Sequence, residues 1–171
     1  GVEHSAGSLG HGLSVSTGMA LAAKSDKKSW QVYCILGDGE SMEGSVWEAM
    51  MSASHYKLNN LTAIIDRNHL SQEGTTAETM QLEPLNEKAE AFGWHVLDVN
   101  GHSIQELLEA FSANTGDQPK LIIANTIKGR GIASLENQTK SHFAHLNKDQ
   151  YQLALKQITN DRNTSWKPDA N

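Results

Sequence analysis

The sequence has one cysteine, no excess of basic residues and no long hydrophobic run, and each absence excludes a class of protein. A single cysteine, Cys34, among 171 residues excludes an intrachain disulfide framework and a zinc site built from several cysteines. It favours a reducing compartment, and we expect the cytoplasm. No stretch approaches about 18 consecutive apolar residues, so we expect no transmembrane helix. Acidic residues outnumber basic ones, 20 to 14, so a basic surface for nucleic acid or for an anionic membrane is absent.

The two ends of the sequence lack the features of a structured or secreted terminus. No methionine precedes Met19, and no basic segment followed by an apolar one is present, so no signal peptide is visible. Because a glycine-rich phrase opens the sequence at once, we expect an upstream segment to be missing from it. The run 160–171 is polar, contains Pro168 and has no apolar periodicity. We therefore expect one domain over residues 1–159 and a loose polar tail over 160–171.

Short apolar runs alternate with segments of helical periodicity. The pattern predicts buried strands at 30–36, 61–66, 94–99 and 121–126. It predicts helices at 13–24, 43–56, 86–92, 103–111 and 148–158. Ser103 and Glu106 form a capping-box pattern, Gly93 and Asn147 are candidate caps, and a long loop is expected over 68–83. The fold class is therefore α/β, an open parallel sheet with helices on both faces.

The tripeptide Gly37-Asp38-Gly39 directly follows the first predicted strand, where open α/β sheets bind ligands. Alone, such a tripeptide is more often a simple turn at a strand end. Asn68 stands 30 residues after Asp38, at the carboxyl end of the next strand. The two side chains lie side by side if the strands are neighbours. A carboxylate, an amide oxygen and a loop carbonyl are hard ligands that suit magnesium bound to a diphosphate.

The spacing of GDG and the following asparagine is the signature of enzymes that use thiamine diphosphate, and longer phrases narrow the resemblance. These phrases are GSLGHG, GDGESMEGSVWEAM, YKLNNLTAIIDRN, LEPL, FGWHVLDVNGH and NTIKGRGI. Over residues 1–158 they resemble the N-terminal half of transketolases, most of all the small subunit of two-part bacterial and archaeal transketolases. The resemblance implies the diphosphate-binding domain of the thiamine-diphosphate-binding fold.

The same resemblance implies roles for individual residues. Asp38 and Asn68 match the side-chain ligands of Mg²⁺ (or of Ca²⁺ or Mn²⁺), and Leu70 matches the residue whose carbonyl completes the set. Ser8 stands where full-length transketolases commonly have proline, and His11 where they often have glutamine. Two roles are equally open for Lys128: its positive charge attracts the diphosphate, or it is a solvated lysine on a loop. The expected cofactor contacts are Gly7, Ser8, Leu9, Gly37, Asp38, Gly39, Glu40, Asn68, Leu70, Lys128 and His142.

Two residues match catalytic positions of the family. His142 matches a histidine that faces the diphosphate and the substrate, and His145 is the neighbouring competitor. Phe143 stands where the family usually has a glycine after that histidine. Glu43 matches a glutamate linked to the cofactor-activating glutamates at the subunit interface. Its alternative role, shared with Glu48, is that of a carboxylate favoured by the helix dipole. Asp66 is expected to support the metal loop, and His4 is a weak candidate for a pocket contact.

The function implied by the resemblance is transfer of a two-carbon ketol unit from a ketose phosphate to an aldose phosphate. The half that binds the pyrimidine of the cofactor is absent from these residues, so we expect activity only with such a partner, in a dimer of such pairs. The helix around Val46, Trp47 and Met50 is a candidate for the assembly interface. Two alternatives are open: a component of another thiamine-diphosphate enzyme, of deoxyxylulose-phosphate synthase or ketoacid dehydrogenase type, and a cofactor-binding subunit without turnover.

Overall fold

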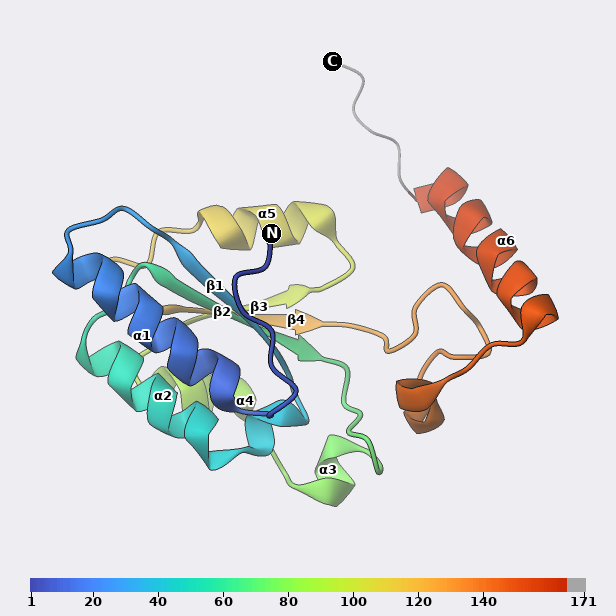
Figure 1. Cartoon of the computed structure of the whole chain (residues 1–171), viewed down its shortest axis with the longest axis horizontal. Helices are drawn as coiled ribbons and strands as arrows, with labels where there is room; N and C mark the ends of the chain where they lie inside the picture. The colour runs from blue at the N-terminus through green and yellow to red at the C-terminus, as the bar shows by residue number, and fades with distance from the viewer. Residues whose placement is uncertain (166–171) are drawn as a thin grey trace, which may run out of the picture. The chain divides into compact units, whose positions relative to one another are not determined.

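The computed structural model describes the backbone of residues 1–165 and the side chains of residues 1–159, which form two compact units. The first unit is Gly1–Thr126, and the second begins at Ile127. The first unit contains the sheet and the helices that cover it, and the second contains one long helix and the loops before it (Figure 1).

Four parallel strands form one sheet in the first unit. They are β1 (Val32–Gly37), β2 (Leu61–Arg67), β3 (His95–Asn100) and β4 (Lys120–Asn125), in the spatial order β1-β2-β4-β3. The open parallel sheet is thereby confirmed, and all four strands lie where the hydropathy pattern predicts them. The first begins two residues late, at Val32, and Trp30 is 57% exposed beside it. Because β1 and β2 are neighbours, the condition for bringing Asp38 and Asn68 together is met.

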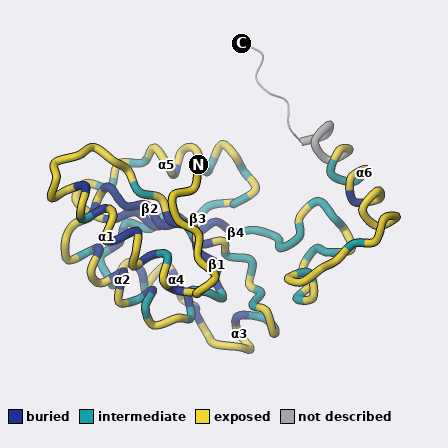
Figure 2. The backbone as a smooth tube through the Cα atoms, viewed as in Figure 1, coloured by how far each residue is buried: buried dark blue, intermediate teal, exposed yellow. Residues whose placement is uncertain are grey.

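Helices cover both faces of this sheet, as predicted. On one face lie α1 (His11–Ser25), α2 (Gly44–His55) and α4 (Leu85–Ala91), and on the other lies α5 (Ile104–Ser112) (Figure 1). The hydrophobic core fills the space between the sheet and the three helices on the first face, α1, α2 and α4. The central strands are buried along almost their whole length, whereas the outward faces of the helices are exposed (Figure 2).

The local sequence explains why these elements form and pack where they do. In α2, Val46, Ala49, Met50 and Ala53 recur at helical spacing and are all buried. The indole nitrogen of Trp94 donates a hydrogen bond to the carbonyl of Met50 at 3.0 Å, which satisfies the polar atom of a buried ring. These contacts attach α2 to the sheet and so hold the loop that precedes the helix in place.

Three local predictions need correction. The loop predicted over 68–83 contains a short helix, α3 (Thr76–Thr79), which begins with a reciprocal capping box between Thr75 and Glu78. At α5 the predicted capping box is only half formed. Ser103 accepts a hydrogen bond from the N–H of Glu106, but the Glu106 carboxylate accepts one from the N–H of Asn100 instead of from Ser103.

The last helix extends beyond its predicted end. In the second unit, a 3-10 turn over Thr139–Phe143 precedes α6 (Lys148–Ser165). Asn147 caps α6 as predicted, because its side chain accepts a hydrogen bond from the N–H of Gln150 at 2.9 Å. The predicted helix end near Ile158, and with it the loose tail from residue 160, is wrong as far as Ser165. The run 160–165 contains neither glycine nor proline to end the helix, and residues 166–171 lie outside the described part.

Candidate functional site

The site begins at the carboxyl end of β1, where Gly37 is the last strand residue and Asp38 follows it. The Asp38 side chain is buried, with 2% of the residue exposed. Its Oδ1 accepts a hydrogen bond from the N–H of Gly39 at 2.8 Å, and its Oδ2 accepts one from the N–H of His69 at 2.6 Å. Burial raises the pKa of the Asp38 carboxyl, and these hydrogen bonds oppose that effect. The carboxylate therefore ties the loop after β1 to the loop after β2.

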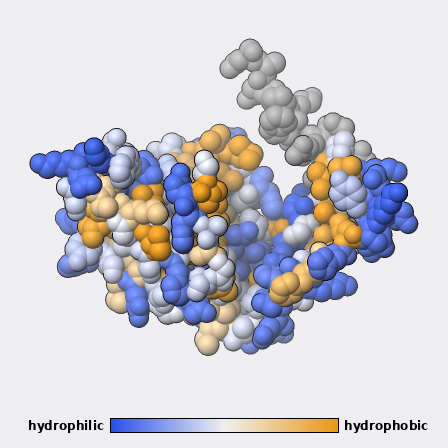
Figure 3. Space-filling model, in the orientation of Figure 1, coloured by the Kyte–Doolittle hydropathy of each residue, from blue (hydrophilic) through white to orange (hydrophobic). Residues whose placement is uncertain are grey.

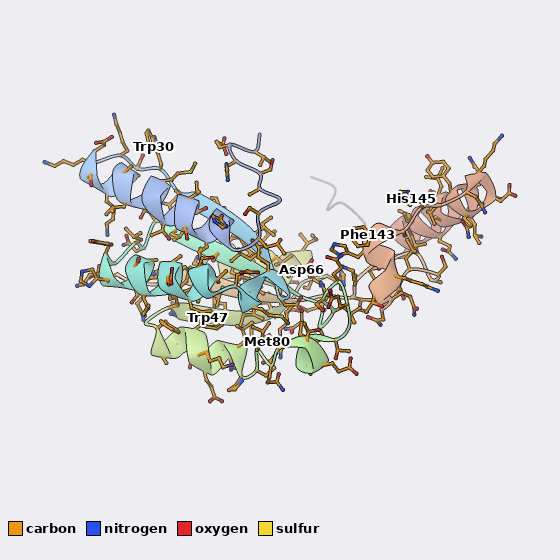
Figure 4. The ribbon with its side chains drawn as sticks, turned by 60° about the horizontal axis from the view of Figure 1, so that its bottom comes forward. Trp30, Trp47, Asp66, Met80, Phe143 and His145 are labelled. Carbon is orange, nitrogen blue, oxygen red and sulfur yellow. The ribbon has the colours of Figure 1, made fainter. Side chains whose placement is uncertain are left out.

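Asn68 lies on that second loop, one residue after the end of β2. Its Nδ2 donates to Oδ1 of Asp66 at 3.1 Å, and its Oδ1 accepts from the N–H of Leu70 at 3.1 Å. Asp66 also accepts a hydrogen bond from the hydroxyl of Thr126. The expected support of the loop by Asp66 is thus present as a contact with Asn68, at the carboxyl edge of the sheet (Figure 4).

Leu70 forms an isolated antiparallel bridge with Thr75. The hydrogen bonds of this bridge use the carbonyl oxygens of His69 and Gly74, at 3.0 and 2.8 Å. Neither bond uses the carbonyl of Leu70, which is therefore not engaged by the bridge. The structure thus brings Asp38, Asn68 and the Leu70 backbone to the same pair of loops.

The chemistry of this donor set fits a divalent cation bound to a diphosphate. Within the described residues no lysine, arginine or histidine forms an ion pair with Asp38, so its buried carboxylate has no cationic partner there. The same part of the chain holds no cluster of three or more His, Cys, Asp or Glu side chains arranged for a metal. Two side chains and one carbonyl leave the remaining positions of an octahedron to phosphate oxygens and water, which is how proteins usually bind magnesium.

The glycine-rich phrase at the start of the chain lies beside the GDG turn. Gly7, Ser8 and Leu9 are exposed, and the buried Gly10 follows them immediately before α1. The N–H of Gly10 donates to Oε1 of Glu40 at 3.0 Å, so residues 30 apart in the sequence are joined. The predicted cofactor contacts at 7–9 and 37–40 therefore belong to two connected segments of the first unit.

Glycine at position 10 is required by the backbone conformation and by space. Gly10 has a φ of 80°, and a Cβ there would lie 2.5 Å from Oγ of Ser45 and 2.6 Å from Cβ of Glu43. At Gly39 a Cβ would lie 3.4 Å from Cβ of Ser71, which is van der Waals contact. The backbone of the GDG turn consequently faces the Ser71 loop without an intervening side chain.

Glu43 is exposed and stands at the N-cap of α2, where its side chain makes no capping hydrogen bond. No specific contact therefore supports the alternative in which Glu43 is a carboxylate favoured by the dipole of α2. Its role at the subunit interface stays a prediction. The assembly surface expected on α2 stays a prediction for the helix, but Val46 and Met50 themselves are each 1% exposed and belong to the core. Trp47 is partly buried against Phe92, with ring centres 5.5 Å apart (Figure 4).

Lys128, His142 and His145 belong to the second unit, and their roles toward a cofactor stay predictions. The Lys128 carbonyl accepts a hydrogen bond from the N–H of Asn137 at 3.0 Å. The two histidines have different surroundings within the unit. Both are exposed. His142 packs edge-on against Phe143, with ring centres 4.7 Å apart, whereas His145 lines a hollow together with Lys140 and Gln150.

A polar network at the same edge of the sheet was not predicted from the sequence. The Arg67 guanidinium donates to Glu83, with Nη2 at 2.6 Å, and to Oδ1 of Asn125 at 2.8 Å. Asn125 in turn donates to Asp98 on β3. The network links β2, β4 and β3, and no sequence signal identifies it because its members come together only through the strand order.

The chain matches known proteins along most of its length. Residues 1–169 match the family described as transketolase, thiamine diphosphate binding domain. A subunit of the apulose-4-phosphate transketolase of Phocaeicola vulgatus is 44% identical over 161 residues, which are 93% of this chain and 57% of that protein. The 6-deoxy-6-sulfo-D-fructose transketolase subunit SqwG of a Clostridium species is 39% identical over 160 residues, 92% of this chain and 58% of that protein.

A solved structure shares the fold. The transketolase of Campylobacter jejuni superimposes with a TM-score of 0.85 at 36% identity, over 93% of this chain and 26% of that one. This chain thus spans little more than half the length of the subunit relatives and about a quarter of the full-length enzyme. None of the helices in the described part is long and apolar enough to cross a membrane. The family match and the resemblance read from the sequence agree, and the chain belongs to the transketolase family as its thiamine diphosphate binding domain.

Proposed function

We propose that this chain is the Mg²⁺- and thiamine-diphosphate-binding half of a transketolase, and that it acts only with a pyrimidine-binding partner half. The assembled enzyme transfers a two-carbon ketol unit from a ketose or ketose phosphate to an aldose or aldose phosphate. The observation that carries the proposal is the placement of Asp38 and Asn68 on adjacent loops, with a buried carboxylate that has no cationic partner in the described residues. Family membership supplies the identity of the cofactor.

The residues of this chain would bind and orient the cofactor. Asp38, Asn68 and the Leu70 carbonyl would hold the cation, which can be Mg²⁺, Ca²⁺ or Mn²⁺, since all three accept hard oxygen ligands. The backbone at Gly39 would lie against the diphosphate, and the 7–9 loop would line the cofactor pocket. When bound, thiamine diphosphate supplies the centre that stabilises the carbanion of the transferred unit. Lys128 would attract the diphosphate by its charge.

His142 would serve the substrate side of the site. An imidazole can hydrogen-bond a sugar or phosphate oxygen, and it can hold or release a proton near neutral pH. Glu43 would act at the contact between two assembled pairs, where the glutamates that start cofactor activation are connected. These two roles come from the resemblance and require the partner half.

The need for a partner is supported by the relatives and by the surface. Two relatives bear the names of transketolase subunits, and a subunit acts together with another chain. Large apolar side chains are exposed on the first unit, among them Ile35 on β1 at 77% and Leu108 on α5 at 63%. Figure 3 shows hydrophobic side chains standing among hydrophilic ones at the surface. An interface that covers such side chains would stabilise the assembly.

We propose the class of the sugar substrates but no individual sugar. The names of the two subunit relatives refer to different sugars, apulose 4-phosphate and 6-deoxy-6-sulfo-D-fructose, so family membership alone does not fix the substrate. A place in the pentose phosphate pathway is therefore one option within the class, and we propose the cytoplasm as the location from the single cysteine.

Complementation tests this function. The full chain is assayed for ketol transfer from a ketose phosphate to an aldose phosphate, with Mg²⁺ and thiamine diphosphate, alone and together with the pyrimidine-binding half of a two-part transketolase. We expect turnover only with both halves. Turnover by the purified chain alone would refute the partner requirement. A stable complex that binds cofactor but transfers no ketol unit would favour the alternatives, a different thiamine-diphosphate enzyme or a subunit without turnover.

A further inference from the structure

The carboxylate of Glu40 joins two segments that both belong to the proposed cofactor site. Its Oε1 accepts a hydrogen bond from the N–H of Gly10 at 3.0 Å, and its Oε2 accepts one from the N–H of Gly37 at 3.2 Å. One side chain thus satisfies two backbone donors, one before α1 and one at the end of β1. Glu40 is half-buried, and no ion pair to it occurs among the described residues.

The carbonyl group of Gly10 is hydrogen-bonded as well. The hydroxyl of Ser45, on α2, donates a hydrogen bond to the carbonyl oxygen of Gly10 at 3.0 Å. The two peptide groups that flank this residue are therefore fixed by side chains from the segment that follows β1. Because Gly10 is buried whereas residues 1–9 are exposed, this is the point at which the 7–9 loop is anchored to the domain.

The charge of Glu40 argues against a direct contact with the cofactor. A diphosphate is anionic, and a carboxylate placed against it would repel it in a partly desolvated site. Both carboxylate oxygens already accept hydrogen bonds from the backbone, and bonds to a charged acceptor are stronger than bonds between neutral groups. The side chain thus joins two segments of the fold, and its negative charge disfavours a place against the diphosphate.

We propose that Glu40 is a positioning residue, which fixes the Gly7–Leu9 loop beside the Gly37–Gly39 turn before the cofactor binds. The inference rests on the proposed function and assigns to Glu40 a role different from the cofactor contact expected from the sequence. Pre-ordering of the two segments removes an entropic cost that binding would otherwise have to overcome. The loss of Glu40 would therefore weaken cofactor binding through the loop and leave the metal ligands in place.

Amide hydrogen exchange in the full chain tests the anchoring step without any cofactor. Glu40→Gln keeps the size of the side chain but replaces one acceptor oxygen by a donor nitrogen. We expect exchange at the N–H of Gly10 to become faster by on the order of 10-fold or more, as for the loss of a hydrogen bond to a charged group. Exchange at Ile122, in the centre of the sheet, should stay as slow as in the unchanged chain. Glu48→Gln, at an exposed glutamate of α2, is the matched control and should leave both amides unchanged.

The second arm measures binding of thiamine diphosphate, with Mg²⁺ in excess, to the chain assembled with its pyrimidine-binding half. We expect the Kd to rise by about 10-fold in Glu40→Gln and to stay unchanged in Glu48→Gln. Unchanged exchange at Gly10 in Glu40→Gln would overturn the inference, and so would faster exchange with an unchanged Kd. A wild-type assembly that binds no thiamine diphosphate would instead refute the proposed function, while the exchange experiment would still report on the anchor.

Discussion

At the scale of single residues, the site depends on what each polar side chain is bonded to. Asp38 is buried and accepts hydrogen bonds from Gly39 and His69, whereas Glu40 accepts hydrogen bonds from Gly10 and Gly37. Two carboxylates that stand two positions apart in the sequence thus have different roles. Asp38 connects the loops after β1 and β2 and has no cationic partner in the described residues, so it is available to a cation. Both oxygens of Glu40 accept backbone hydrogen bonds, as those of Asp38 do, but Glu40 joins the end of β1 to the residue before α1 and not to the loop that carries Asn68.

His142 and His145 give a prediction at this scale. In the assembled enzyme, we expect His142→Ala to lower kcat by on the order of 10²-fold, typical of the loss of a general acid or base, and to change cofactor affinity less. His145→Ala is the control, because it removes the same imidazole chemistry from the same stretch of chain. Steady-state kinetics with both sugars varied provides the measurement. A larger loss in His145→Ala would move the role to His145, and no loss in either variant would show that the family role does not apply here.

At the scale of secondary-structure elements, the strand order decides which side chains meet. Strand–helix–strand connectivity predicts that consecutive parallel strands lie close together, so the meeting of Asp38 and Asn68 could be foreseen from the sequence. The Arg67 network could not, because Asn125 lies 58 residues beyond Arg67 and meets it only because β4 inserts between β2 and β3. The Glu40–Gly10 hydrogen bond, which spans 30 residues, also left no pattern in the sequence, because it forms only where the start of α1 meets the segment after β1.

For the helices, too, some features could be predicted from the sequence and others could not. The apolar spacing of α2 predicted its buried face, but it could not tell burial in the core from burial at an interface, and Val46 and Met50 proved to be core. The end of α6 was placed too early because its last turns are polar, and polarity indicates solvent exposure, not the end of a helix. The cap at Asn147 was predictable, because a capping hydrogen bond is local.

The ion pair between Arg67 and Glu83 gives a prediction about these elements, since it connects β2 to the segment before α4. Burial disfavours ionised Glu83, but hydrogen bonds from the Leu85 N–H and from Arg67 outweigh it, so that the pKa of Glu83 lies below its ordinary value. Ionised Glu83 therefore stabilises the fold at pH values above the pKa of an unfolded glutamate, about 4.3. This stabilisation is lost as the pH falls through the lower pKa that Glu83 has in the folded state.

We expect Glu83→Gln to lower the free energy of unfolding by about 1 kcal/mol at pH 7, because the pair is partly exposed and screened by solvent. The loss should be smaller at pH 3 than at pH 7, as measured by urea unfolding at the two pH values. Glu87→Gln, an exposed glutamate on α4, is the control and should change neither value. A destabilisation of equal size at both pH values would show that the charge of Glu83 is not the cause.

At the scale of the whole molecule, the first unit is a folded domain whose proposed cofactor site lies at the carboxyl edge of its sheet. The chain covers only part of the length of its relatives, and large apolar side chains such as Ile35 and Ile104 are exposed on it. Under the proposed function, this chain holds the cation and the diphosphate, and a partner half holds the pyrimidine and most of the sugar. That division makes cation-dependent cofactor binding the property that belongs to this chain's own residues.

The most direct test of that central claim is calorimetric titration of thiamine diphosphate into the assembled enzyme, with Mg²⁺ in excess. Asp38→Asn keeps the shape of the side chain but removes its charge, and we expect affinity to fall by on the order of 10²-fold or more, at least as much as for the loss of a group that supports a metal ligand. Asp117→Ala, at an exposed surface ion pair, is the matched control and should bind as the unchanged enzyme does. Circular dichroism verifies that each variant is folded. Undiminished affinity in folded Asp38→Asn would contradict the account.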